Sequence, residues 1–232
     1  MSQQHEHPRT PERSPSAHPG PGLFVVFEGG DGAGKSTQAA RLAEALDAAG
    51  ETVLRTREPG GTEIGEELRS LVLDHGHGTV DPRTEALIFA AARAAHVEQV
   101  ILPALAAGHV VVCDRYIDSS VAYQGVGRGL GVEDVLNVNR WATQGLIPHL
   151  TVLLDVDAAA GRRRRTVRDA GGADRLEAES DDFHTRNRRA FLDLAAGDPA
   201  RYLVLDAGQG VDELAGAVLE RVRGLRGTGA GA

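Results

Sequence analysis

The amino-acid sequence predicts an α/β fold in which helices cover both faces of a five-stranded parallel sheet. Five short runs of β-branched and apolar residues alternate with longer stretches of helical character. Three of these runs are almost entirely apolar, which is typical of strands that are buried on both faces. Such alternation gives right-handed crossovers and a three-layer sandwich, so a ligand is expected outside the carboxyl ends of the strands.

The predicted strands are separated by enough chain for a helical crossover each time. They are Leu23–Glu28, Thr52–Thr56, Val110–Cys113, Thr151–Asp155 and Tyr202–Leu205. Helices are expected to begin near Lys35, Thr62, Pro82, Val132, Ala158, Asp182 and Val211. Asp81 and Asp157 each precede a predicted helix and have the side chain of an N-cap residue. Proline at the first helical position, as in Pro82, strengthens the first of these assignments.

One folded domain, residues 23–223, contains all of these elements. Residues 1–22 carry five prolines and show no apolar period, so they are predicted to form a disordered tail. Residues 224–232 are rich in Gly and Ala and are predicted to form a flexible C-terminal tail.

The net charge of −8 argues against a protein that holds a nucleic acid polymer, because such proteins carry a basic face. Arginines are nevertheless dense at 162–165, and a local cationic site suits a small polyanion. The single cysteine, Cys113, excludes an intramolecular disulfide and suits the cytoplasm. No signal sequence or membrane-spanning apolar run is evident, so no membrane association is expected.

Residues 29–36 fit the phosphate-loop pattern G-x-x-x-x-G-K-S/T without a departure. They are Gly29, Gly30, Asp31, Gly32, Ala33, Gly34, Lys35 and Ser36. The loop follows a predicted strand and opens a predicted helix, the context that the motif requires. Its backbone N–H groups and the helix N-terminus would cradle phosphates. Lys35 would reach the β- and γ-phosphates and Ser36 would hold Mg²⁺, while the loop alone indicates only a nucleoside triphosphate.

Arginines elsewhere in the chain indicate a second anionic substrate. Arg57 and Arg115 end the second and third predicted strands, and Arg69 and Arg93 lie on predicted helices. An acceptor phosphate is largely ionised at neutral pH, so its transfer chemistry needs positive charge and alignment more than a strong base. Asp114 has the position of an aspartate that orients Mg²⁺. Taken singly, each arginine is more often a surface ion pair, and only their convergence favours a site.

Five segments of the chain carry a resemblance to one family. They are Phe27–Thr37, Thr56–Thr62, Leu87–Arg93, Asp114–Gly125 and Asp174–Glu177. Over residues 23–222 the chain resembles the bacterial thymidylate kinases, and the second and fourth segments are specific to that family. The resemblance implies a P-loop enzyme that transfers phosphate from ATP to dTMP with Mg²⁺, in the cytoplasm and as a homodimer.

The resemblance also implies roles for individual residues. Phe89 would stack on the thymine ring, Arg93 would hydrogen-bond its edge, and Ser120 and Gln124 would complete the base pocket. Tyr123 would crowd the 2′ position of the sugar, and Asp31 would approach the 3′-hydroxyl. The remaining expected contacts to dTMP are Glu58, Pro59, Arg69, Arg115 and Ser119, with a cis bond at Glu58–Pro59. Thr37 would join the phosphate loop in binding ATP.

The arginine-rich helix that begins near Ala158 is expected to form a short lid over ATP. Some thymidylate kinases carry the transition-state arginine in the phosphate loop, and others carry it in the lid. No basic residue occupies positions 30–33 here, so the lid type is expected, with Arg164 or Arg168 as the donor. The turn at 169–173 is longer than usual, which leaves Arg175 open as a third choice.

Two other functions remain open on the sequence alone. One is a kinase on the same fold that acts on another pyrimidine nucleotide, which a panel of monophosphates would reveal. The other is a nucleotide-binding regulator that senses ATP without transferring phosphate. A regulator would not need arginines on both the acceptor and the lid side.

Overall fold

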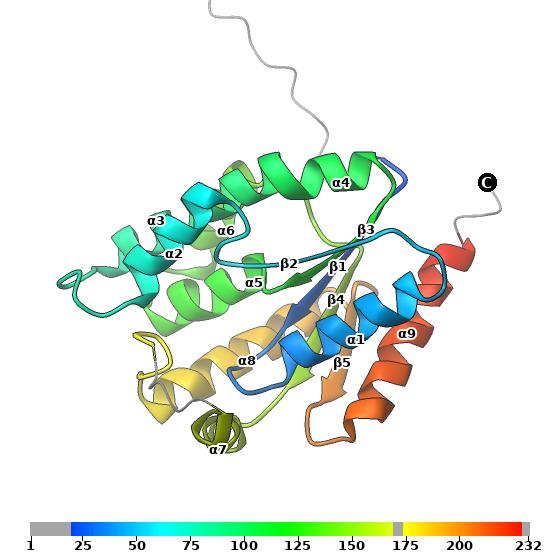
Figure 1. The fold of residues 1–232 in the computed structure, drawn as a ribbon. Helices are drawn as coiled ribbons and strands as arrows, with labels where there is room; N and C mark the ends of the chain where they lie inside the picture. Colours follow the sequence, from blue (N-terminus) through cyan, green and yellow to red (C-terminus); the bar gives the residue numbers. More distant parts are fainter. Residues whose placement is uncertain (1–19, 169–173, 229–232) are drawn as a thin grey trace, which may run out of the picture.

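The computed structural model describes residues 20–168 and 174–228, with the side chains of all of these except 165–168, 227 and 228. Its strands are β1 (Leu23–Glu28), β2 (Val53–Arg57), β3 (Val110–Asp114), β4 (Leu150–Asp155) and β5 (Tyr202–Asp206). They form one sheet in the order β2-β3-β1-β4-β5, and every neighbouring pair is parallel. Helices lie on both faces of this sheet, so the predicted three-layer sandwich is confirmed (Figure 1).

Most of the helices begin within one residue of the predicted positions. The helical segments are α1 (Lys35–Asp47), α2 (Glu63–Leu73), α3 (Pro82–His96), η1 (Val97–Ile101), α4 (Leu102–Ala106), α5 (Ile117–Ser120), η2 (Val121–Gly127), α6 (Val132–Ala142), α7 (Ala158–Arg168), α8 (Asp181–Gly197) and α9 (Val211–Thr228). The sequence did not predict α5 and η2. All residues from Ser120 to Gly125 are buried, so this segment has no polar face and therefore no amphipathic period to detect.

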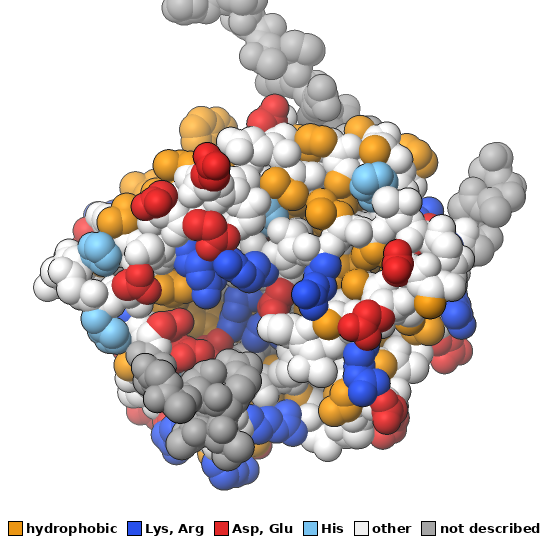
Figure 2. Space-filling view, in the orientation of Figure 1, with side chains coloured by type: hydrophobic (Ala, Val, Ile, Leu, Met, Phe, Trp, Pro, Cys, Tyr) orange, Lys and Arg blue, Asp and Glu red, His pale blue; other side chains and the backbone are white. Residues whose placement is uncertain are grey.

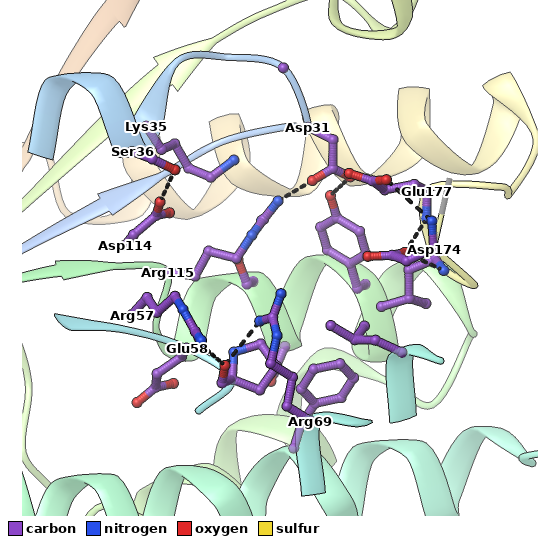
Figure 3. Close-up of a pocket in the computed structure, with 18 of the residues that line it drawn as sticks. Asp31, Lys35, Ser36, Arg57, Glu58, Arg69, Asp114, Arg115, Asp174 and Glu177 are labelled. Atoms are coloured by element: carbon purple, nitrogen blue, oxygen red, sulfur yellow. Dashed lines mark hydrogen bonds and ion pairs between the residues drawn. The ribbon is translucent and has the colours of Figure 1, made fainter. Parts of the chain in front are cut away.

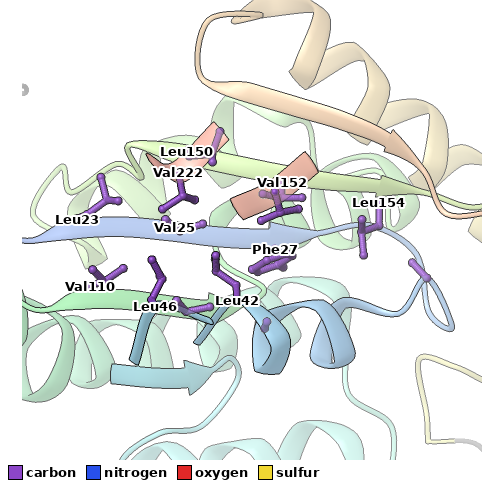
Figure 4. Packing of buried hydrophobic residues seen from close by; sticks show 14 of the residues in the cluster. Leu23, Val25, Phe27, Leu42, Leu46, Val110, Leu150, Val152, Leu154 and Val222 are labelled. Atoms are coloured by element: carbon purple, nitrogen blue, oxygen red, sulfur yellow. The ribbon is translucent and has the colours of Figure 1, made fainter. Parts of the chain in front are cut away.

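Side chains of β1 alternate between two cores because both faces of the strand are covered. Leu23, Val25 and Phe27 pack with residues of α1 and α9 on one face (Figure 4). Phe24 and Val26 pack on the opposite face with residues of η1, α4 and α6. This placement anchors the loop that follows β1 between two helical layers.

One continuous helix runs through α3, η1 and α4. Its 25 residues, Pro82–Ala106, are long and apolar enough to cross a membrane by length and composition alone. Glu85, Arg93 and His96 are nevertheless fully or almost fully buried against other protein groups. It is therefore a core helix of the domain.

Both predicted N-caps are present. Asp81 accepts hydrogen bonds from the backbone N–H groups of Arg83 and Thr84, and Asp157 accepts one from Ala160.

At the ends of the domain, the predicted N-terminal tail lies outside the described residues except for 20–22, where Gly22 donates to the carbonyl of Leu105. Helix α9 continues to Thr228, so the first residues of the predicted C-terminal tail are helical.

Candidate functional site

A pocket opens beyond the carboxyl ends of β1, β2 and β3, where a ligand was expected. Its walls come from the phosphate loop and from segments after β2 and β3, with contributions from α2, α3, η2 and the residues Asp174, Leu176 and Glu177. Lys and Arg side chains gather in this hollow, and Asp and Glu side chains surround it (Figure 2). The pocket is thus a cationic depression in an acidic protein.

Glycines shape the phosphate loop at the positions where the backbone needs a positive φ. Gly29 has φ +133° and Gly32 has φ +78°, a region that side chains disfavour. A Cβ atom at Gly29 would lie 2.3 Å from the carbonyl oxygen of Leu154, and one at Gly32 would lie 2.3 Å from that of Gly161. Larger residues would therefore push the loop away from β4 and α7. The loop leads directly into the N-terminus of α1, which favours an anion.

Lys35, the first residue of α1, carries the main cation of this loop. Its Nζ donates to the carbonyls of Gly29 (3.0 Å) and Gly30 (2.8 Å), and the side chain is largely buried. Burial, followed by the nearby charge of Arg115, lowers the pKa of Lys35 to about 8. An incoming polyphosphate would oppose both effects and stabilise the ammonium.

Two oxygen-bearing side chains that suit a cation lie next to Lys35 in the pocket wall. The Ser36 hydroxyl donates to the Asp114 carboxylate at 2.5 Å, which brings the start of α1 and the end of β3 together (Figure 3). Both groups offer oxygen ligands, the type that Mg²⁺ prefers.

Three guanidinium groups face the pocket from the acceptor side. Arg57 and Arg69 both donate to the carbonyl of Pro59, at 2.9 and 3.0 Å, and the Glu58–Pro59 bond is cis as expected. Burial, followed by the charge of Arg57, lowers the pKa of Arg69, and Arg115 acts in the same direction. The three cations therefore repel one another, and a bound anion would relieve that repulsion.

Arg115 connects this cluster to the phosphate loop. Its guanidinium donates to the carbonyl of Gly29 (3.3 Å) and to Ser119 Oγ (3.0 Å), and it forms an ion pair with Asp31 (Figure 3). Asp31 also accepts a hydrogen bond from the hydroxyl of Tyr123 at 2.8 Å. One phosphate-loop carboxylate thus contacts two side chains of the acceptor wall.

A buried carboxylate supports the turn that carries Arg115. Glu28 accepts hydrogen bonds from the backbone N–H groups of Tyr116 (2.8 Å) and Ser119 (3.1 Å), and from Ser119 Oγ (2.7 Å). Burial, followed by the charge of Asp118, raises the pKa of Glu28 to about 8. Because Ser119 also contacts Arg115, Glu28 helps to fix the direction of that guanidinium.

The end of the pocket away from the phosphate loop is largely apolar and is lined by Leu73, Phe89 and Leu176. Arg93 lies beside it and pairs with Glu58 at 2.6 Å, with both side chains almost completely buried. Phe89 and this polar pair form a slot that suits a flat heterocycle with hydrogen-bonding groups on one edge.

Behind Glu58 lies a cluster of potential metal ligands. Glu58, His96 and Cys113 place ligand atoms within 4.8 Å of one another. Each already has a protein partner, because His96 bonds to Glu58 (3.0 Å) and Thr56 (2.7 Å), and Cys113 donates to the carbonyl of Arg115 (3.1 Å). These hydrogen bonds to protein groups explain the cluster without a metal.

The structure brings most of the predicted site residues to the pocket. All residues predicted to contact dTMP line it: Asp31, Glu58, Pro59, Arg69, Phe89, Arg93, Arg115, Ser119, Ser120, Tyr123 and Gln124. From the phosphate-loop segment, the lining includes Asp31, Gly32, Gly34, Lys35, Ser36 and Thr37. Gly29, Gly30 and Ala33 shape the loop but are not part of the described lining.

The predicted lid arginines are the exception. Arg164 is not among the described lining residues, and its guanidinium donates to the carbonyl of Ala207 at 2.8 Å. The side chain of Arg168 lies outside the described residues. Arg175 contacts Glu85 and the carbonyl of Val72, and it does not line the described pocket either.

Four lining residues received no role in the sequence analysis: Leu73, Asp174, Leu176 and Glu177. Three of them lie in the segment Asp174–Glu177. The resemblance of this segment to the family was the signal that could have assigned these residues to the site. Leu73 ends α2 and has no motif, because only tertiary packing places it in the pocket.

A phosphate loop that faces three guanidinium groups across one pocket defines a class of protein. It is a P-loop phosphotransferase that brings two anionic substrates together.

Comparisons with known proteins place the chain within this class. Residues 27–218 match the family profile described as thymidylate kinase. The thymidylate kinase of Clavibacter sepedonicus is 53% identical over 91% of this chain and 99% of its own length. That of Cutibacterium acnes is 52% identical over 88% and 98%, respectively. A crystal structure of thymidylate kinase from Ehrlichia chaffeensis superposes with a TM-score of 0.70 and 32% identity, covering 87% of this chain and 98% of the other. The chain belongs to the thymidylate kinase family.

Proposed function

We propose that the protein transfers the γ-phosphoryl group of ATP to dTMP, giving ADP and dTDP in the cytoplasm. The observation that carries this proposal is the single pocket that joins a phosphate loop to Arg57, Arg69 and Arg115 and ends in the slot beside Phe89. Membership of the thymidylate kinase family supports thymine as the base.

In this proposal the two substrates meet between two cationic walls. ATP is held by residues 29–37, and Lys35 contacts its β- and γ-phosphates. Arg69 and Arg115 hold the acceptor phosphate with Arg57 nearby, so that an acceptor oxygen lies in line with the γ-phosphorus. Asp31 and Tyr123 are placed at the sugar. Their mutual hydrogen bond supports this assignment because it positions a carboxylate and an aromatic ring at the same part of the pocket.

The oxygen ligands Ser36 and Asp114 fit the Mg²⁺ that accompanies ATP. A Mg²⁺ ion held there would supply positive charge to the phosphates of ATP. The protein's own contribution is to hold the Ser36 hydroxyl and the Asp114 carboxylate next to each other at the start of α1.

We assign the transition-state arginine to α7, and we favour Arg168 over Arg164. Positions 30–33 offer no basic side chain. Arg164 is engaged by the Ala207 carbonyl and Arg175 by Glu85, whereas position 168 lies one helical turn beyond Arg164.

Arg168→Ala is therefore expected to lower kcat by about 10³-fold with little change in dTMP affinity, as measured by steady-state kinetics and calorimetry. Arg164→Ala is the matched control and should have a smaller effect on kcat. Wild-type turnover in Arg168→Ala would remove this residue from the mechanism.

The homodimer is also part of this proposal. Helices α3 and α6 pack together and expose Leu87 (58%) and Trp141 (85%), apolar side chains that water solvates poorly. A second copy that covers this surface would bury them. Sedimentation velocity should give a dimer that Trp141→Asp weakens, and a monomeric wild-type protein would contradict this part of the proposal.

A coupled assay of ADP release across dTMP, dUMP, UMP and CMP tests the function. We expect the highest kcat/KM with dTMP, and a lower value for UMP than for dUMP because this proposal assigns Tyr123, a residue of the pocket wall, to the 2′ position of the sugar. The proposal fails if dTMP elicits no ADP release, or if UMP or CMP is the better acceptor.

A further inference from the structure

Glu85 is a completely buried carboxylate on α3 that has no role in the function proposed above. Its Oε1 accepts hydrogen bonds from Gln124 Nε2 at 2.8 Å and from Arg128 Nε at 3.3 Å. Its Oε2 accepts from Arg128 Nη2 at 3.2 Å and from Arg175 Nη2. Two guanidinium groups thus compensate the buried charge, and the third partner is a residue of the pocket wall.

The contact with Glu85 fixes the orientation of the Gln124 amide. An ionised carboxylate can only accept hydrogen bonds, so Gln124 must turn its NH₂ group toward Glu85. The amide oxygen is then the atom left for a ligand, and none of the described residues donates to it. Gln124 is 1% exposed and lines the pocket, so a bound base is the available partner for this oxygen.

Arg93 gives the same part of the pocket a donor of fixed position. Its Nε donates to Glu58, and its Nη1 donates to Ser120 Oγ at 2.9 Å and to Asn139 Oδ1. Its Nη2 donates to the carbonyl of Tyr116 at 3.0 Å. A guanidinium has five N–H groups, so these contacts leave one N–H on Nη2 for the pocket that Arg93 lines.

An amide oxygen and a guanidinium N–H form a pattern that distinguishes pyrimidines. Thymine and uracil present a donor at N3–H and an acceptor at the C4 carbonyl, which complements this pair. Cytosine presents an acceptor at N3 and a donor at its 4-amino group, so both contacts would be mismatched. Each unpaired or opposed buried polar group would weaken the binding of cytosine relative to thymine.

We infer that Glu85 is a specificity-determining positioning residue, which holds the Gln124 amide in the orientation that admits 4-keto pyrimidines and rejects 4-amino pyrimidines. This inference rests on the proposed function. Glu85 does not touch the base but acts through Gln124. Without an acceptor-only partner, the amide of Gln124 is free to rotate by 180° and to present its NH₂ group to N3 of cytosine.

The test is the ratio of kcat/KM for dTMP to kcat/KM for dCMP in Glu85→Gln. The new amide can donate as well as accept, so it no longer selects one orientation of Gln124. We expect the ratio to fall about 10- to 100-fold, with kcat/KM for dCMP rising above the wild-type value. A residue that serves only stability would lower both values together and leave the ratio unchanged.

Glu179→Gln is the matched control. Glu179 accepts from Nη1 of Arg128, whereas Glu85 accepts from its Nε and Nη2, so the loss of Glu179 also weakens the arginine network while the amide of Gln124 keeps its partner. This variant should preserve the wild-type ratio. If Glu85→Gln does not fold, Glu85→Asp keeps the charge for the arginines but shortens the reach to Gln124, and it should lower the ratio to a smaller extent.

A double-mutant comparison separates the possible outcomes. In a Gln124→Leu background, Glu85→Gln should not change the ratio further, because the amide through which it acts is absent. An unchanged ratio in the single Glu85 variants, or the same change with and without Gln124, overturns the inference while wild-type activity on dTMP keeps the proposed function. A wild-type protein without dTMP-dependent ADP release overturns both.

Discussion

The two ends of the pocket present positive charge by different means. At the phosphate-loop end, consecutive residues supply backbone N–H groups, one lysine and the N-terminus of α1. At the acceptor end, side chains arrive from α2, α3, η2 and the segments after β2 and β3. The first end is local in sequence, and its geometry follows from glycine conformations. The second exists only once the chain has folded, and hydrogen bonds within the protein hold its polar groups in place.

This difference implies different sensitivities. Lys35 lies in a loop of glycines, so few neighbouring side chains could replace its positive charge. Its loss should therefore directly lower the rate of phosphoryl transfer. The acceptor arginines also contact other protein groups, as Arg57 and Arg69 both donate to the carbonyl of Pro59, so their loss should act on binding and on stability.

The largest expected difference comes from one substitution at each end. Lys35→Met should lower kcat by about 10²- to 10³-fold, because it removes a charge aimed at the transferring phosphoryl group. Arg69→Met should instead raise KM for dTMP by about 10- to 100-fold, the loss of a charged hydrogen bond, and leave KM for ATP nearly unchanged. Steady-state kinetics with each substrate varied in turn would distinguish the two patterns. Equal effects of Arg69→Met on both KM values would contradict a division into donor and acceptor ends.

Stability should depend more strongly on the acceptor end. Glu58→Gln breaks the buried pair with Arg93 and the contact with His96, and we expect a loss of about 3–5 kcal/mol in the free energy of unfolding. Glu66→Gln is the control, because its pair with Arg57 is about half exposed on both sides and should contribute less than about 1 kcal/mol. Urea denaturation of the two variants measures the difference. Similar losses in both would show that burial of the Glu58 pair has no special importance.

The pH dependence should also differ between the two ends. The pKa of Lys35 is lowered to about 8 by burial and by Arg115, so Lys35 is charged below pH 8 and loses its proton above it. Consequently kcat/KM for ATP should fall by up to about tenfold per pH unit above pH 8, and ATP binding near pH 8 should be accompanied by proton uptake. Arginines keep their charge over this range, so kcat/KM for dTMP at saturating ATP should vary less from pH 7 to 9. Any change there should follow Glu28, whose pKa of about 8 affects this end through Ser119 and Arg115. Calorimetry in two buffers of different ionisation enthalpy measures the proton uptake, and its absence would contradict the lowered pKa.

The same comparison explains what could be predicted from the sequence. The strands, the phosphate loop and the N-caps Asp81 and Asp157 depend on local patterns, and the structure has them where they were expected. Segment Ile117–Gly127 was missed as a helix because the burial of all residues from Ser120 to Gly125 removes the amphipathic signal. Leu73 and Glu85 belong to no motif. Leu73 lies in the pocket wall and Glu85 behind it only because of the way α2, α3 and η2 pack.

Family resemblance placed acceptor residues such as Phe89 and Gln124 that composition and periodicity could not have separated from ordinary core residues. It did not anticipate the internal contacts of the site. The pairing of Asp31 with Arg115 and of Glu85 with Gln124 joins residues more than 35 positions apart in the chain. Such contacts require three-dimensional packing, and a linear motif does not encode them.

The most direct test of the central claim is a crystal structure of the protein with dTMP and a non-hydrolysable ATP analogue. We expect the γ-phosphate of the analogue at Lys35, and the dTMP phosphate within hydrogen-bonding distance, about 2.7–3.2 Å, of Arg69 and Arg115. The thymine ring should lie against Phe89 in the same pocket. A dTMP phosphate bound away from these arginines, or a base outside that slot, would contradict the account.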